Sequence, residues 1–215
     1  MRTVIGAVAV AAVLAGCGSG GSSAVTTAQG SALPIATVDD RSDGPSIACT
    51  GLDKALATSL GRQSVGKHGK ALPKLTLPCL GGGPAVALAG LRGPAVLNVW
   101  ASWCGPCGDE VGFLVAAEKL LHSQVRFIGV DLADEPADAR TWNAYHQVGW
   151  PSLVDPHGAL RGPLHVPGPP VTFFISSDGT IAGVHYGAFT SADEVRRAVA
   201  TKLGVGTPAS AKGLG

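Results

Sequence analysis

The feature that most constrains this chain is a pair of cysteines, Cys104 and Cys107, placed where a strand should give way to a helix. The apolar run 95–100 before the pair is typical of a buried strand. After it, apolar residues recur at helical spacing from 113 to 121. Backbone N–H groups and the helix dipole favour an anion at a helix start, here a thiolate. We therefore expect Cys104 to be the exposed attacking thiol at the helix N-terminus and Cys107 the resolving thiol one turn further in.

A C-x-x-C pair is also half of a common zinc site, but no second C-x-x-C or Cys/His pair exists here to complete one. The full string 100–107, Trp-Ala-Ser-Trp-Cys-Gly-Pro-Cys, is more specific and resembles the active site of thioredoxins. Pro106 suits the first helical turn, where its missing N–H costs little. We expect Trp103, Gly105 and Pro106 to contact the substrate, and we predict neither a metal nor another cofactor.

The first residues predict export. Met1-Arg2 provides a positive start, and the apolar run 4–14 is too short to cross a bilayer comfortably. Leu14-Ala15-Gly16-Cys17 resembles a bacterial lipobox, which implies cleavage before Cys17 and a lipid on its sulfur. The alternative is an ordinary secretory signal with a chance cysteine. The lipobox places the protein at the extracytoplasmic face of a bacterial cell membrane.

Composition divides the rest of the chain. Residues 1–16 are the predicted signal peptide, 17–47 a flexible tether rich in Gly, Ser, Ala and Thr, 48–203 one thioredoxin-like domain, and 204–215 a loose tail. Within the domain, hydrophobic patterns predict strands within 71–89 (two short ones), at 95–100 and at 125–131, an extended piece at 150–155, and a hairpin of 171–176 and 181–186. They also predict three helices, one after the cysteine pair to about 122, one over 136–147 and a last one over 192–203. We expect Ala139, Trp142 and Tyr145 on one side of the second helix, and Thr190 or Ser191 as the cap of the last. The net charge of +1 gives no sign of nucleic-acid binding.

This order is that of an α/β thioredoxin fold with two additions, an N-terminal strand pair and a central helical insert. The additions resemble those of the extracytoplasmic TlpA, ResA and CcmG group, and the resemblance covers about 72–203. Residues 166–174 are similar to that group's V-P-G-x-P-T-T-F segment. The resemblance implies that Pro170 follows a cis peptide bond beside the cysteines, and that Pro169, Pro170 and Val171 contact the substrate. Because Pro169 has no N–H, one expected backbone bond is missing, and the grip would depend on Thr172, Trp103 or the Pro169 carbonyl.

Two positions concern protons. Asn98 stands six residues before Cys104, where thioredoxins place a buried aspartate that helps deprotonate the resolving thiol, and an amide cannot take that proton. Glu110 lies three residues after Cys107 on the same helix face, where the TlpA-like group also has a glutamate. Our hypothesis is that Glu110 relays protons to Cys107. The alternative is an exposed glutamate that merely favours the helix dipole, as we expect for Asp109.

The sequence has five cysteines. Lipidation would use Cys17, which leaves four that can form two pairs, Cys104 with Cys107 and Cys49 with Cys79. A structural bridge between Cys49 and Cys79 would contribute about 3–4 kcal/mol by loop-closure entropy. Two alternatives remain open here, namely two unpaired thiols, or exchange between Cys79 and the active-site pair.

The resemblance implies a thiol–disulfide oxidoreductase, tethered to the membrane and without nucleic-acid partners. Its Gly-Pro dipeptide matches thioredoxin, which favours reduction of protein disulfides, such as those of apocytochrome c, with electrons from a membrane donor protein. The alternative is an oxidant that delivers disulfides to exported proteins.

Two further functions are weaker alternatives. Peroxiredoxins share the fold but carry T-x-x-C, whereas Ala101 stands at the threonine position. Copper-binding assembly proteins of the Sco type carry C-x-x-x-C and a distal histidine; the spacing here is one residue shorter, although His165 or His185 could serve as the histidine.

Overall fold

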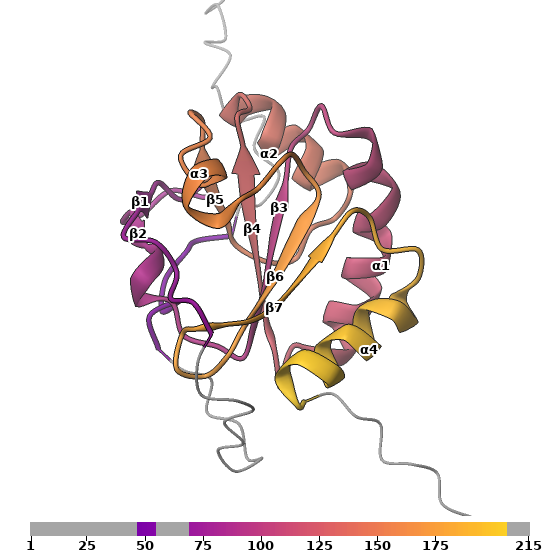
Figure 1. The fold of residues 1–215 in the computed structure, drawn as a ribbon. Coiled ribbons are helices and arrows are strands. Elements are labelled where there is room, and N and C mark those ends of the chain that lie inside the picture. The colour runs from indigo at the N-terminus through magenta and orange to yellow at the C-terminus, as the bar shows by residue number, and fades with distance from the viewer. Residues whose placement is uncertain (1–46, 55–68, 206–215) are drawn as a thin grey trace, which may run out of the picture. The chain divides into compact units, whose positions relative to one another are not determined.

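A computed structural model describes residues 47–54 and 69–205, which are coloured in Figure 1. They all belong to one compact unit, Asp39–Gly215. The predicted signal peptide, Cys17, nearly all of the tether and the tail beyond residue 205 lie outside the described residues. None of the helices in 47–54 and 69–205 is long and apolar enough to cross a membrane.

A five-stranded mixed sheet forms the centre of the unit, in the order β5-β4-β3-β6-β7. Strand β3 lies in the middle, parallel to β4 and antiparallel to β6. All six of its residues are buried, because both faces of the sheet are covered, so the predicted buried strand is confirmed. The strands are β3 Ala95–Trp100, β4 Arg126–Leu132, β5 Ser152–Asp155, β6 Val171–Ile175 and β7 Ile181–Tyr186.

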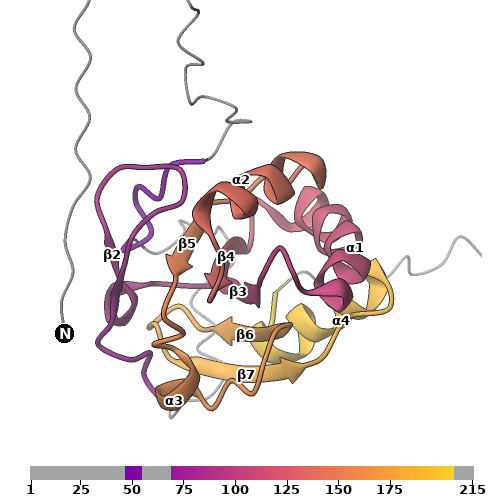
Figure 2. The same cartoon turned by 90° about the horizontal axis from the view of Figure 1, so that it is seen from above.

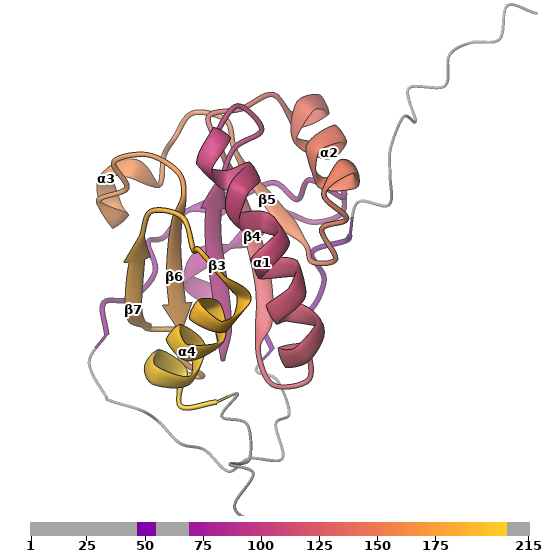
Figure 3. The ribbon, with the colours of Figure 1, turned by 90° about the vertical axis from the view of Figure 1, so that its right-hand side faces the viewer.

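Helices cover one face of this sheet, as Figures 2 and 3 show. They are α1 Gly105–Leu121, α2 Pro136–Tyr145 and α4 Ala192–Leu203. The opposite face is covered by a two-stranded antiparallel sheet and short helical turns, namely β1 Thr76–Leu77, β2 Val86–Ala87, the 3-10 turn η1 Leu88–Gly90 and α3 Arg161–Leu164. This is the thioredoxin fold with the N-terminal strand pair and the helical insert that the sequence predicts.

The predicted elements are found close to their expected bounds. The short helices η1 and α3 were not predicted, because three or four residues are too few to show a helical period. Ser191 caps α4 by accepting a hydrogen bond from the Glu194 N–H at 3.2 Å, which confirms one of the two expected caps. Gly204 ends that helix with a positive φ of 66°.

Tyr145 is a correction. We expected it on the same side of α2 as Ala139 and Trp142, but its side chain is 81% exposed. A helix turns once in about 3.6 residues, so a residue six positions after Ala139 has rotated well away from the buried side.

The Cys49–Cys79 disulfide is present, with 5.8 Å between the two Cα atoms. Cys79 follows β1 and forms an isolated antiparallel bridge with Leu153 of β5. Both cysteines are buried in the core on the strand-pair side of the sheet. The disulfide thus ties segment 47–54 to the edge of the central sheet.

Candidate active site

The two cysteines of the C-x-x-C motif lie at the junction of β3 and α1, where the sequence predicts them. They form a disulfide, with 5.3 Å between their Cα atoms. Cys104 is the N-cap of α1, and its Sγ accepts a hydrogen bond from the Cys107 N–H at 3.2 Å. Pro106 occupies the first turn. The site therefore offers a sulfur atom the unpaired N–H groups of a helix start.

Our expectation that Cys104 is exposed is wrong for this disulfide form. Only 5% of Cys104 and 1% of Cys107 are accessible. Both cysteines pack in a buried cluster with Leu80, Trp100 and Ala101. The exposed neighbours are Trp103, at 55%, with Gly105 and Pro106. The three residues that we predicted to contact the substrate therefore form exposed surface next to the cysteines.

The loop before Cys104 is held by the loop that follows β4. Both carboxylate oxygens of Asp134 bind Ser102, accepting from its N–H at 2.5 Å and from its hydroxyl at 3.0 Å. The Trp103 Nε1–H donates to the carbonyl of Ala133 at 3.0 Å. These contacts fix the backbone and the exposed indole next to the disulfide.

Helix α2, the predicted helical insert, packs against the strand that leads to the active site. The ring of Trp100, at the end of β3, stacks on that of Trp142 of α2, with centroids 4.3 Å apart. Trp100 is only 2% exposed, in keeping with the core position that its place at the strand end predicts.

The predicted proline segment lies at the same end of the sheet. The Pro169–Pro170 bond is cis. Val171 opens β6 opposite Val99 of β3, so the segment runs beside the strand that leads to Cys104. Pro169 is partly exposed and offers only its carbonyl.

Two residues of this segment, Val171 and Thr172, are buried. The side chains of Val171 and Thr172 are 1% and 0% exposed. Successive strand residues face opposite sides of the sheet, and here both sides are covered. Neither side chain is therefore exposed in this disulfide form, and a contact between Val171 and the substrate stays a prediction.

Glu110 is buried, with 1% of its surface exposed, so the exposed alternative is wrong. Its Oε1 accepts a hydrogen bond from Asn98 Nδ2 at 2.9 Å, and its Oε2 accepts from the Phe189 N–H at 2.9 Å. Asn98 also donates to the Thr172 hydroxyl at 3.0 Å. Burial raises the pKa of Glu110 above its ordinary value, although the two hydrogen bonds oppose the rise. A buried acid of raised pKa thus sits three residues beyond Cys107.

A second buried acid, Asp131, was not predicted. It is fully buried near the end of β4, opposite Trp100 of β3, and neither of its carboxylate oxygens has a hydrogen-bond partner among residues 47–54 and 69–205. Burial first, and then the carboxylates of Asp134 and Asp155, raise the pKa of Asp131 to about 8. The group is therefore mostly protonated at neutral pH.

The two histidines named from the sequence have different places. His165 is exposed at the C-terminal end of α3. His185, on β7, stacks on Phe189 with ring centroids 3.9 Å apart. Within 47–54 and 69–205, no group of three His, Cys, Asp or Glu side chains is arranged to hold a metal ion.

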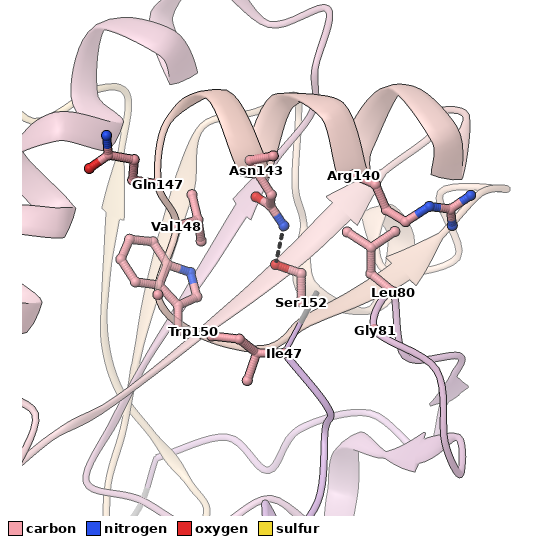
Figure 4. Close-up of a pocket in the computed structure, with 11 residues that line it drawn as sticks. Ile47, Leu80, Gly81, Arg140, Asn143, Gln147, Val148, Trp150 and Ser152 are labelled. Carbon is pink, nitrogen blue, oxygen red and sulfur yellow. Dashed lines mark hydrogen bonds between the residues drawn. The ribbon is translucent and has the colours of Figure 1, made fainter. Parts of the chain in front are cut away.

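A cavity of about 440 Å³ lies between α2, the start of β5 and the turn after Cys79, and its lining includes neither active-site cysteine nor the cis-proline. Figure 4 shows Asn143 and Ser152 pointing toward each other at its wall, with 3.3 Å between Asn143 Nδ2 and Ser152 Oγ. The remaining wall is mostly apolar, with Leu80, Val148 and Trp150 among its residues.

A central sheet of this topology, a cysteine pair at the start of α1 and a cis-proline beside it define a thioredoxin-fold thiol–disulfide oxidoreductase. The sequence model of the AhpC/TSA family matches residues 68–184, and the chain belongs to that family.

Relatives and solved structures agree with this class. The chain is 37% identical over 129 residues to the thiol:disulfide interchange protein DsbE of Pseudomonas fluorescens, covering 59% of this chain and 69% of that protein. It is 39% identical over 98 residues to DsbE of Haemophilus influenzae, covering 43% of this chain and 49% of that one. Thus it spans only about half of the second relative's length. A secreted Mycobacterium tuberculosis disulfide oxidoreductase, homologous to E. coli DsbE, superposes with a TM-score of 0.53 at 26% identity, over 60% of this chain and 96% of that one.

Proposed function

We propose that this protein is a membrane-anchored, extracytoplasmic oxidoreductase that reduces disulfides in exported proteins. The observation that carries the proposal is the Cys104–Cys107 pair at the start of α1, with the buried carboxyl of Glu110 one turn further along the same helix. Because the pair itself supplies and accepts two electrons, the reaction needs no other cofactor.

The proposed reaction starts from the reduced pair. The Cys104 thiolate attacks one sulfur of the substrate disulfide, whose S–S bond breaks, and the departing substrate thiolate takes a proton. A mixed disulfide now joins Cys104 to the substrate. Cys107 loses its proton, attacks the Cys104 sulfur and releases the second substrate thiolate, which is protonated in turn. The substrate gains two electrons and two protons, and the pair becomes the disulfide seen in the structure.

We propose that Glu110 accepts the proton that Cys107 loses. Its buried carboxylate accepts two hydrogen bonds, which leave lone pairs on the oxygens for a proton. Because burial raises it, the pKa of Glu110 is closer to the pKa of a thiol than the pKa of an exposed glutamate is. Similar pKa values of donor and acceptor favour proton transfer.

Substrate selection in this proposal depends on the backbone beside Cys104. An extended substrate chain would pair with the carbonyl of Pro169 and lie against the exposed indole of Trp103, with Gly105 and Pro106 at its side. Apocytochrome c, whose haem-site cysteines must be reduced, is the proposed substrate, and a membrane thiol protein is the proposed electron donor. The resemblance to the CcmG group supports both assignments.

The proposed anchor is a lipid on Cys17. Its support is the lipobox-like 14–17 behind a positive start and a short apolar run. Mass spectrometry of the membrane-bound protein should find a diacylglyceryl group on an N-terminal Cys17. Recovery of an unmodified protein from the periplasmic fraction would contradict the anchor but leave the oxidoreductase activity standing.

The direction of the reaction is tested by the reduction potential of the full chain, equilibrated with dithiothreitol or glutathione buffers at pH 7. A Gly-Pro dipeptide between the cysteines predicts a value close to the roughly −270 mV of thioredoxin. A value close to the roughly −120 mV of DsbA would instead identify an oxidant that donates disulfides.

The role of Glu110 is tested separately with Glu110→Gln, which keeps the shape of the side chain and removes the acid. We expect slower resolution by Cys107 at neutral pH and a changed pH profile. Asp109→Asn, at the exposed neighbouring position, is the control and should leave the profile unchanged. A wild-type profile in Glu110→Gln would rule out the relay.

A further inference from the structure

Strand β7 forms one edge of the central sheet. It is the last strand in the order β5-β4-β3-β6-β7, and Figure 3 shows it at the rim of the sheet. Among the described residues, only the start of this edge has a second neighbour: Ala71 bridges to Thr180, and the Ile181 N–H donates to the Lys70 carbonyl at 3.0 Å. The rest of β7, up to Tyr186, is paired with β6 alone. Such an edge presents a row of backbone donors and acceptors.

The hydrogen-bonding pattern shows which backbone groups face outward. In an antiparallel ladder, pairs that exchange hydrogen bonds alternate with pairs that do not. The Gly187 N–H donates to the Pro170 carbonyl at 3.1 Å, so the next pair, Tyr186 with Val171, does not exchange hydrogen bonds. The same holds for Val184, two residues earlier in β7. The N–H and C=O groups of Val184 and Tyr186 therefore point away from β6, towards the edge.

An apolar pocket of about 320 Å³ lies beside this edge, and its lining includes Leu164, Phe173, Val184 and Tyr186. Val184 is paired in register with the buried Phe173, so the two side chains point to the same face of the sheet. The side chain of Tyr186 is 57% exposed. The outward backbone groups and the pocket together form a surface that we call the β7 groove.

The β7 groove carries a positive charge near the start of the strand. Lys70 lines the pocket, and its ammonium group donates one of its three hydrogens to the Pro163 carbonyl at 2.8 Å. None of the described residues that line the pocket is acidic. A carboxylate in the groove would therefore meet an opposite charge and no like charge.

The other end of the β7 groove leads towards the active site. Tyr186 lies opposite Val171, the residue after the cis-proline, and Val171 lies opposite Val99 of β3. Two strand spacings, about 10 Å, separate the edge from the strand that precedes Cys104. Three residues of extended chain span that distance.

We propose that the β7 groove binds an extended segment of a protein substrate, close in sequence to the disulfide that Cys104 attacks. This inference rests on the oxidoreductase activity under Proposed function. The segment adds a strand antiparallel to β7, as residues 70–71 do at the start of the same edge. Its backbone exchanges hydrogen bonds with Val184 and Tyr186, its apolar side chains enter the pocket, and a carboxylate lies near Lys70. Backbone groups at strand spacing select a polypeptide, and the pocket selects its side chains.

The binding test uses the full chain and a fluorescently labelled hexapeptide of alternating threonine and valine that ends in a free carboxylate. In a strand added to β7, the residues opposite Val184 and Tyr186 have side chains on the pocket face and N–H groups that reach the edge. N-methylation of the valines should therefore weaken binding by roughly 3- to 10-fold for each hydrogen bond lost. N-methylation of the threonines, whose N–H groups point away from β7, is the control and should leave binding unchanged. Fluorescence anisotropy measures the dissociation constants.

Substitutions test the same groove from the side of the protein. Tyr186→Pro removes the outward N–H and keeps the ladder to β6, whereas Tyr186→Ala keeps that N–H and removes the ring. Tyr186→Pro should weaken binding roughly 3- to 10-fold more than Tyr186→Ala. Lys70→Met should weaken binding of the free-carboxylate peptide and leave that of its C-terminal amide unchanged. If the proline variant does not fold, the methylated peptides still decide the outcome on the wild-type protein.

Hydrogen exchange completes the test. The amides of Val184 and Tyr186 should exchange rapidly in the protein alone and become protected when the peptide is added. Protection in the protein alone would show that the edge is already paired, and would overturn the inference. Equal binding of the two methylated peptides, or no binding of the unmodified one, would also overturn it. The reduction potential of the Cys104–Cys107 pair is measured without any peptide, so failure of the groove and failure of the proposed activity are distinguishable.

Discussion

The side-chain amide of Asn98 on β3 and the carboxylate of Glu110 on α1 form a buried hydrogen bond of 2.9 Å. Thioredoxins place their buried acid on the strand, at the position that Asn98 occupies here. In this protein the acid comes from the helix instead, and the strand residue holds it. The buried carboxyl of Glu110 thus lies on the same helix as Cys107, three residues further along.

Asn98→Leu should raise the pKa of Glu110 further, because the amide hydrogen bond opposes the rise that burial causes. We also expect a loss of about 1–3 kcal/mol in the free energy of unfolding for the unpaired carboxyl oxygen. The measurements are carboxyl NMR and urea denaturation. An unchanged pKa would mean that Asn98 does not tune the acid.

Asp131→Asn tests the second buried acid. The folded protein binds this proton more tightly than the unfolded chain, since the pKa of Asp131 is raised from 3.8 to about 8. Its contribution to stability is therefore complete below about pH 4 and decreases as the pH rises towards 8, by roughly 1.4 kcal/mol per unit at most. The variant should escape this decrease. Urea denaturation of the oxidised proteins between pH 4 and 8 should show the variant gaining on the wild type, and parallel curves would contradict the assignment.

Asp134→Asn should act on both the active-site loop and Asp131. Removing its charge should lower the pKa of Asp131 from about 8, because the Asp134 carboxylate is the first of the two charges that raise it. It should also weaken the bonds to Ser102 and slow disulfide exchange at Cys104. Asp138→Asn, on the exposed first turn of α2, is the matched control. Exchange rates equal to wild type would show that the loop holds its place without Asp134.

The double substitution Cys49→Ala and Cys79→Ala should lower the free energy of unfolding by about 3–4 kcal/mol, since the disulfide closes a loop with a sequence separation of 30. The reduction potential of the active-site pair should not change. Stability is measured by urea denaturation of the otherwise oxidised protein. A change in potential would indicate that the structural bridge and the active site are coupled.

Pro169→Ala restores a backbone N–H beside the active-site disulfide. If an extended substrate pairs there, one added hydrogen bond should lower KM by roughly 3- to 10-fold, the equivalent of about 1 kcal/mol. The control is Pro167→Ala, at an exposed position of the same segment. A KM that rises or stays the same would show that the substrate does not use this backbone position.

Much of the fold is legible in the sequence, because strands and helices of ordinary length show their own periods. The buried run 95–100, the helix after Cys107 and the hairpin around Asp178 and Gly179 are all found where the patterns predict them. The turns η1 and α3 and the outward direction of Tyr145 were missed or misplaced. Each depends on a few residues whose local pattern is too short to decide.

For the candidate site, the local sequence is enough to predict the reactive groups, namely two cysteines at a strand–helix junction, a proline segment and a glutamate one turn after Cys107. The environment of these groups depends on how distant segments pack together. The buried carboxylate of Glu110 is hydrogen-bonded by the Asn98 amide, 12 residues away, and by the N–H of Phe189, 79 residues away. That Asp131 stays protonated follows from covered faces of the sheet and neighbouring carboxylates. Burial and long-range hydrogen bonds arise only when distant segments pack together, so no local pattern could have revealed them.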